Sequence, residues 1–350
     1  MKQNMRGPLL GLLGAILLAA GCATSSVSIQ VLVPADINVS EDIKLLALVN
    51  RYRPEKGEGF LNVIEGAVSG ENIGQDRRSA DEALAGLTNA LAGSPRFSIT
   101  RPAVELKGTG RGDFPAPLLA EEVNDICNKS SAQALVTIEA FDSDQSVACT
   151  TQVRERKNKA GETEKYTVWC ARKTIHVTVG WRMYAAGSGK LVDEFRMLES
   201  VYFNSEGNSE AIAIQNLPQG EAVTREIGRV TGSRYSQRIS PTWLWVNRMY
   251  YTKGNDNLKL GKKQVKFNDW KGAADYWGRA LDDDKLKNQG RAMYNLALAA
   301  EMEGDLQGAS DKAQEAGNTY NNRKALSYFY ILQQRIRDQE RLQEQMKGAE

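Results

Sequence analysis

Acid–base chemistry in this sequence would depend mainly on carboxylates, because the 350 residues contain one histidine, His176. A metal site built from several imidazoles is impossible, and a Ser-His-Asp triad would have to use this residue. His176 lies in the alternating run 174–184, where we interpret it as structural. Glu121–Glu122 and the Asp142/Asp144 pair could serve a hydrolase, although solvated faces are the interpretation we favour. We therefore predict a non-enzymatic protein without cofactor or metal.

Two glycine-rich stretches approach the patterns of nucleotide-binding loops. Gly187–Lys190 is followed by Leu191, where a phosphate-binding loop needs Ser or Thr. Gly108–Asp113 places an aspartate where the third glycine of a dinucleotide fingerprint belongs. We interpret the first stretch as a hairpin turn and the second as a flexible loop.

Composition narrows the classes of protein. The chain carries 45 Lys+Arg against 43 Asp+Glu, a formal charge of +2. A general nucleic-acid binder needs a clear basic excess, so this balance argues against that class. Apolar residues make up 41%, and the length suits about two domains with buried cores.

The first 22 residues have the pattern of a bacterial lipoprotein signal. The apolar run Leu9–Ala20 has 12 residues, fewer than the roughly 20 of a spanning helix, and suits a signal peptide. It leads into Leu18–Cys22, which resembles the lipobox. We expect residues 1–21 to be removed and Cys22 to carry palmitate or similar acyl chains, with 22–40 as a tether. The alternative is an ordinary secretory signal in which Cys22 is incidental.

Three further cysteines would lie in a compartment that permits disulfides. Cys149 and Cys170 flank the polar segment Arg154–Lys165, which has a turn signal at Gly161. If this region is a hairpin, the two thiols could lie opposite each other and form a disulfide, with Cys127 buried on a helix. The alternative is three buried free thiols.

Residues 41–240 predict an α/β or α+β domain with a mixed sheet. Short apolar or alternating runs indicate strands, and apolar residues at helical spacing indicate helices. The expected strands are 27–33, 43–49, 97–99, 134–141, 174–184 and 191–203, and the expected helices are 78–92, 118–129, 211–214 and 222–230. Alternating elements followed by hairpins indicate a layered arrangement of helices on a sheet.

The pattern becomes helical after residue 255 and then repeats. The step Asn268–Trp270 recurs as Gly304–Leu306, and Ala273 recurs as Ala309, 36 residues later. This period resembles that of the tetratricopeptide repeat, about 34 residues, and implies an all-α domain of helix pairs over 255–338.

Large aromatic residues gather in and after the segment 241–254, which we interpret as an interdomain aromatic segment. A charged tail, 339–350, closes the chain. The candidate interaction surface is aromatic and consists of Trp243, Trp245, Tyr250, Trp270 and Trp277.

The chain resembles an uncharacterised bacterial lipoprotein family, a domain of unknown function with a tetratricopeptide-like C-terminus. The resemblance lies in the lipobox, the strand Asp42–Arg51, the segment Arg238–Trp245 and the step Asn268–Trp270. It implies a place in the cell envelope and no established activity. The element order of 41–240 also loosely resembles the CsgG and LpoB lipoproteins, which is an analogy of fold alone.

We therefore expect a lipid-anchored outer-membrane protein of unknown molecular function, a binding or assembly scaffold for an envelope protein or glycan. Ala23 after the lipidated cysteine favours the outer membrane, by resemblance to Gram-negative lipoproteins. A first alternative is a CsgG-like self-assembling secretion or pore component, whose mark would be a long amphipathic hairpin within 147–184. A second is a carboxylate-based envelope hydrolase that uses Glu121 or Asp142.

Overall fold

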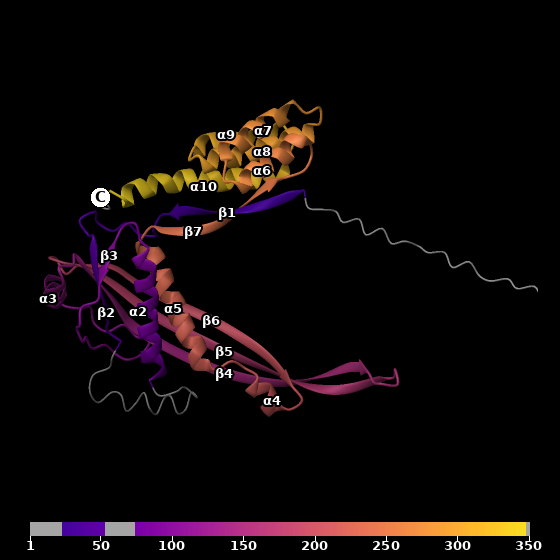
Figure 1. Cartoon of the computed structure of the whole chain (residues 1–350). Helices are drawn as coiled ribbons and strands as arrows, with labels where there is room; N and C mark the ends of the chain where they lie inside the picture. The colour runs from indigo at the N-terminus through magenta and orange to yellow at the C-terminus, as the bar shows by residue number, and fades with distance from the viewer. Residues whose placement is uncertain (1–22, 53–73, 348–350) are drawn as a thin grey trace, which may run out of the picture. The chain divides into compact units, whose positions relative to one another are not determined.

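The computed structural model describes residues 23–52 and 74–347, which fall into two compact units (Figure 1). One unit holds the residues up to Ile29 and Trp245–Ile336, and the other holds Gln30–Leu244 and the residues from Arg337. The strands are β1 Thr24–Val33, β2 Leu45–Asn50, β3 Ser98–Thr100, β4 Ala134–Lys157, β5 Thr163–Ala185, β6 Leu191–Gly207 and β7 Thr242–Tyr251. The helices are α2 Gln75–Ala92, α3 Ala120–Ser130, α4 Glu210–Gln215, α5 Gly220–Ile239, α6 Asp256–Lys266, α7 Trp270–Arg279, α8 Leu286–Met302, α9 Leu306–Asn318 and α10 Arg323–Gln345.

A five-stranded mixed sheet forms the centre of the unit Gln30–Leu244. Its order is β3-β2-β4-β5-β6. Strand β2 runs parallel to β3 and β4, whereas β5 is antiparallel to both β4 and β6. Strands β1 and β7 form a separate two-stranded sheet.

The apolar run predicted as a buried strand is confirmed as β2, and both of its faces are covered. Leu46 and Leu48 pack in one cluster with Leu84 and Leu87 of α2. The alternate residues, Ala47 and Val49, pack in another cluster with Val123 and Ile126 of α3. Side chains alternate between the faces of a strand, so α2 and α3 cover opposite faces of the sheet.

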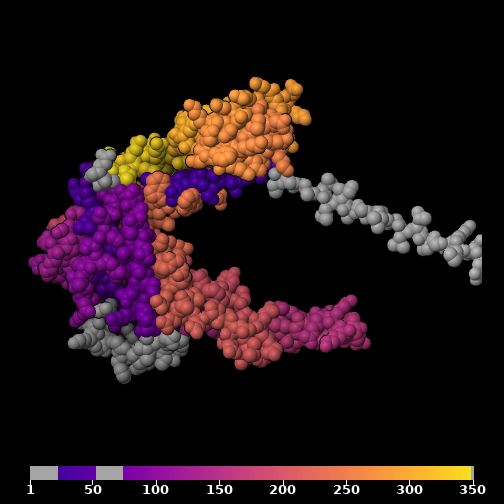
Figure 2. Space-filling model, viewed as in Figure 1, coloured from indigo at the N-terminus to yellow at the C-terminus, as the bar shows by residue number. Residues whose placement is uncertain are grey.

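Strands β4 and β5 are far longer than the sequence predicted. Their ladder continues from Ala134↔Ala185 to Lys157↔Thr163, although the apolar pattern of β4 ends near residue 141. Charged side chains replace apolar ones in the distal part: Arg156 pairs with Glu164, and Arg154 with Glu206 of β6. The segment predicted as polar and turn-containing is therefore mostly strand. Figure 2 shows this hairpin extending beyond α4.

The C-terminal region is all helical, with five helices from α6 to α10. The predicted recurrence is visible at two helix starts. Asp269 accepts a hydrogen bond from the Gly272 amide, and Asp305 from the Gly308 amide, each at 2.8 Å. These N-caps satisfy amides that the first turn of a helix leaves unpaired. The matching small residues of α7 and α9, Ala273 and Ala309, are fully buried in the helical core.

Close packing of α6 on α7 depends on a glycine. A Cβ atom at Gly261 would lie 2.2 Å from Nε1 of Trp277, whose side chain is fully buried. A Cβ atom at Gly278, in α7, would meet nothing within 4 Å. The two glycines belong to the same helical unit and form a matched pair.

We predict that Gly261→Ala lowers the free energy of unfolding by about 1–3 kcal/mol, because the indole must shift within a packed core. Gly278→Ala should instead raise it by up to about 1 kcal/mol, since alanine is the better helix former. Urea denaturation of both variants and the parent chain measures the difference. Equal effects of the two substitutions would contradict the packing described.

Candidate functional site

The carboxyl ends of β2 and β3 form a topological switch point. The chain goes from β2 to α2 on one face of the sheet and from β3 to α3 on the other. In open α/β sheets such divergence opens a crevice beyond the strand ends, and ligands bind there preferentially. The topology therefore points to the ends of β2 and β3 as the candidate site.

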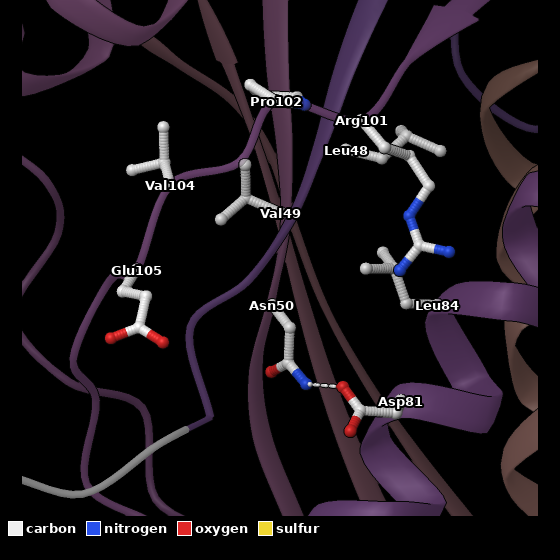
Figure 3. Close-up of a pocket in the computed structure, with 9 residues that line it drawn as sticks. All are labelled: Leu48, Val49, Asn50, Asp81, Leu84, Arg101, Pro102, Val104 and Glu105. Atoms are coloured by element: carbon white, nitrogen blue, oxygen red, sulfur yellow. Dashed lines mark hydrogen bonds between the residues drawn. The ribbon is translucent and has the colours of Figure 1, made fainter.

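A crevice of about 250 Å³ lies at this place. Figure 3 shows Asn50 and Asp81 joined by a hydrogen bond, 2.7 Å long, with Arg101 and Glu105 on opposite sides of Val49. The lining of the crevice comes from β2, α2 and the segment after β3. It consists of Leu48, Val49, Asn50, Asp81, Leu84, Arg101, Pro102, Val104 and Glu105.

The crevice offers one guanidinium, two carboxylates and an amide above an apolar floor. The Asn50 amide is already oriented, because Oδ1 accepts from the Tyr52 backbone amide while Nδ2 donates to Asp81. Such a set can orient a small polar molecule that carries both donors and acceptors. Glu105 and Arg101 reach the crevice from the segment 101–119, so the position of that segment decides the shape of the site.

A buried carboxylate organises this segment. Glu139 of β4 is fully buried, and its Oε2 lies 2.8 Å from Nη1 of Arg51 and 3.8 Å from Nη1 of Arg182. Its Oε1 accepts from the hydroxyls of Thr137 and Tyr184. Both oxygens are thus satisfied, as a buried carboxylate requires.

The partners of Glu139 hold the main chain of 101–119. Arg51 donates to the carbonyls of Lys107 and Ala116, at 3.1 and 2.8 Å. Arg182 donates to the Pro115 carbonyl at 2.7 Å, and its guanidinium lies 4.7 Å from the centre of the Phe114 ring. The segment 108–113, predicted as a flexible loop, is instead held against the sheet by these bonds and by the Tyr52 hydroxyl, which donates to the Gly110 carbonyl. These bonds position the crevice wall.

Tyr184 also links Glu139 to the main chain of 101–119. Burial, reinforced by the negative charge of Glu139, raises the pKa of Tyr184 to about 12. The phenol therefore stays protonated and donates to Glu139, while its oxygen accepts from the Leu118 amide at 3.3 Å. The sequence analysis did not identify Arg51, Glu139 or Arg182 as site residues. The available signal was a charge inside each of two predicted strands, Glu139 in 134–141 and Arg182 in 174–184.

A second group of carboxylates lies at the start of α2. Asp76 accepts hydrogen bonds from the hydroxyl and the amide of Ser143. Burial, with smaller contributions from Asp142 and Asp144, raises the pKa of Asp76 to about 7. Asp142 and Asp144, which the sequence analysis identified, thus raise the pKa of Asp76, which it did not identify. Glu122 caps α3 by accepting from the Leu119 amide.

The one histidine lies on an open face of the sheet. His176 Nδ1 and Ser200 Oγ are 2.8 Å apart, and Asp144 is opposite His176 on β4. In a triad the aspartate binds Nδ1 and the serine binds Nε2, whereas here the serine occupies Nδ1. The positions of Ser200 and Asp144 beside His176 therefore support the structural interpretation of this histidine.

The candidate aromatic surface divides into exposed and buried residues. Trp243 and Trp245, on alternate positions of β7, are 49% and 69% exposed. Tyr250, Trp270 and Trp277 are instead buried in the core of the helical unit, so they were wrongly assigned to a surface. Trp270 and Trp277 belong to the first unit of the repeat, at positions that Leu306 and Ala313 occupy 36 residues later.

The predicted disulfide is wrong, although the predicted hairpin is confirmed. Cys149 pairs with Ala171, and Cys170 pairs with Thr150. This one-residue offset sends the two side chains to opposite faces, and both thiols are free. Cys127 is buried on α3 as predicted, and burial raises its pKa to about 11.

Several predictions concern the membrane and metals. Cys22 and the lipobox lie outside the described residues. Within 23–52 and 74–347, no helix has the length and hydropathy to cross a bilayer. Across the same ranges, His, Cys, Asp and Glu side chains form no group of three or more suited to a metal ion.

Gly187–Lys190 lies in the turn between β5 and β6, as predicted.

Comparison with known proteins identifies the family. Residues 43–251 match the model of a domain of unknown function, DUF8603, and residues 259–334 match another, DUF6340. The first match covers more than half of the chain, so the chain belongs to the DUF8603 family. No curated protein matches the sequence.

Two solved structures are distantly similar. A "putative lipoprotein from Caulobacter crescentus CB15" is 14% identical, with a TM-score of 0.20 over 55% of this chain and 84% of that one. A "putative neuraminyllactose-binding hemagglutinin homolog from Helicobacter pylori" is 10% identical, with a TM-score of 0.19 over 58% and 94%. At these scores neither similarity carries an argument about this chain.

We predict that Asp76 makes the protein less stable as the pH rises from about 4 to about 7. The folded chain holds a proton on this carboxyl that the unfolded chain releases near its ordinary pKa of 3.8, so stability falls across that window and levels off above it. Asp76→Asn should remove this slope and raise stability at pH 8 by up to about 4 kcal/mol.

Urea denaturation at a series of pH values measures this effect. Glu121→Gln is the control, because Glu121 is an exposed carboxylate of α3 that does not contribute to the pKa of Asp76. Parallel stability curves for the parent chain and Asp76→Asn would contradict the assignment.

Proposed function

We propose that this chain is a lipid-anchored protein of the bacterial outer membrane that acts as a non-enzymatic binding or assembly scaffold. Two features support the proposal: the lipobox-like Leu18–Cys22 sequence and the extended β sheet. The anchor would rest on acyl chains joined to Cys22, and several chains together are needed for stable membrane attachment.

The observation that carries the scaffold role is the open face of the extended sheet. We define this open face by Thr174, His176, Leu198, Ser200 and Tyr202, which share one side of β5 and β6. Leu198 is 74% exposed and Tyr202 is 65% exposed. Large apolar groups beside polar ones on an extended surface are typical of protein-binding patches.

The opposite face of the same strands is already covered. Ile175 and Val177 pack in the core cluster that includes α5 residues, and Ala171 packs with Ala213 of α4. The exposure of Leu198 and Tyr202 therefore follows from the covering of only one face. We propose that an envelope protein binds to the open face, with a glycan as the alternative partner.

The helical region supports the same role. We propose that α6–α7 and α8–α9 are degenerate tetratricopeptide-like pairs, on the basis of the matching caps at Asp269 and Asp305. Repeats of this kind stack into extended binding surfaces. A helical region of this type would provide a second surface for a partner.

Self-assembly is a second candidate, and one observation favours it. Strand β6 has 17 residues and lies at the edge of the five-stranded sheet. A long edge strand presents backbone donors and acceptors that can pair with another chain. The hairpin end carries Arg154, Arg156 and Lys157, so assembly at the membrane surface suits it better than insertion into lipid.

Photo-crosslinking in living cells tests the proposal. We predict that a benzophenone amino acid at Tyr202 gives a defined crosslinked product, because a partner covers the open face. The matched control places it at Phe267, which is 80% exposed in the helical unit. A product that contains a different envelope protein or glycan supports the scaffold, and a product between two copies supports self-assembly.

Identical product patterns at the two positions, or none at Tyr202, would contradict an occupied open face. Cys22→Ser serves as the anchor control. It should release the full chain from the membrane fraction and abolish palmitate labelling, and retention of both would contradict the lipid anchor.

A further inference from the structure

A cavity of about 510 Å³ lies in the helical unit, separate from the crevice at β2 and β3. Its walls come from the end of β7, the first turns of α8 and the connection from α9 to α10. The lining residues are Tyr251, Leu286, Lys287, Arg291, Tyr320, Asn321, Asn322, Arg323 and Lys324. Four of the nine are cationic, and no carboxylate is among them.

The four cationic side chains keep their charges uncompensated. In the part of the chain that the structure describes, Lys287, Arg291, Arg323 and Lys324 form no ion pair. Arg291 donates to the Lys253 carbonyl at 2.7 Å, and the Lys324 ammonium lies 3.4 Å from Sδ of Met249. Neither neutral partner cancels a positive charge.

The cavity wall is held in place by its own hydrogen bonds. The Tyr251 hydroxyl donates to Oδ1 of Asn322 at 3.1 Å, and Nδ2 of Asn322 donates to the Gly290 carbonyl at 2.9 Å. Close approach of Tyr320 to α8 needs Gly290, where a Cβ atom would lie 2.7 Å from the Tyr320 Cβ. The cations therefore surround a preformed space.

Aromatic and aliphatic groups supply the remaining surface. The guanidinium of Arg291 lies 5.4 Å from the centre of the Tyr251 ring, which orients its charge at the cavity wall. Tyr320 and the exposed Leu286 add apolar area. The site thus combines concentrated positive charge with surfaces that accept an organic group.

We propose that this cavity binds a phosphomonoester, with the phosphate among the four cations and the organic group on Tyr251, Tyr320 and Leu286. A phosphomonoester carries a charge of about −1.5 to −2 and three strong acceptor oxygens. Arginine forks and lysine ammoniums match that group. A single carboxylate would balance only one of four positive charges.

Calorimetric titration of the full chain in a non-ionic detergent tests this site, with phenyl phosphate as the probe. We expect measurable binding that weakens with added salt, and benzoate should bind at least tenfold more weakly. The double variant Lys287→Gln/Arg323→Gln should lose at least tenfold in affinity. The control Lys263→Gln/Lys266→Gln removes two exposed charges from α6 and should bind like the parent.

Two further probes distinguish the source of the phosphate. Short-chain phosphatidic acid that binds more tightly than phenyl phosphate would identify a lipid headgroup as the ligand, and equal affinity would identify a soluble phosphomonoester. Short-chain phosphatidylcholine should not bind. The proposal is overturned if benzoate or phosphatidylcholine binds as tightly as phenyl phosphate, if the parent chain binds none of them, or if both double variants bind alike. Far-ultraviolet circular dichroism verifies that each variant is folded.

Discussion

The structure around the crevice depends on one buried charge, the carboxylate of Glu139. A fully buried carboxylate is tolerated only when cations and donors surround it, and Arg51, Arg182 and Tyr184 meet that need. The same three side chains also bond the backbone of 101–119. The charge that needs compensation therefore fixes a long irregular segment that has no strand or helix of its own over much of its length.

This arrangement links the sheet to the candidate site. Strand β2 ends at Asn50 and Arg51 follows it, so Asn50 lines the crevice while the next residue pairs with the buried charge of Glu139. The crevice wall after β3 continues into the segment that Arg51 and Arg182 hold. Changes in the charge network should consequently alter the crevice before they alter the helical unit, which has its own buried pair of Arg248 and Glu301.

The sequence predicted the elements whose burial is periodic and missed those stabilised by charge. Strand β2 was predicted from its short apolar run, and helix α3 was predicted because its apolar residues fall on one helical face. The distal half of β4 and β5 was missed because pairs such as Arg156 and Glu164 replace apolar contacts there. The crevice is lined by both Asn50 and Arg101, which are about fifty residues apart in the sequence. A local sequence pattern cannot predict that two such distant residues line the same crevice. The disulfide prediction failed because the strand register was not known from the sequence. A one-residue offset decides whether Cys149 and Cys170 share a face of the sheet.

Hydrogen exchange of Glu139→Gln tests the central claim most directly. This substitution keeps the shape of the side chain and removes the charge that Arg51 and Arg182 compensate. The account predicts that amides of 101–119 exchange at least tenfold faster than in the parent chain, while helices α6–α9 keep their protection. Unchanged exchange in 101–119, or an equal acceleration across both units, would contradict the claim that this carboxylate fixes the segment.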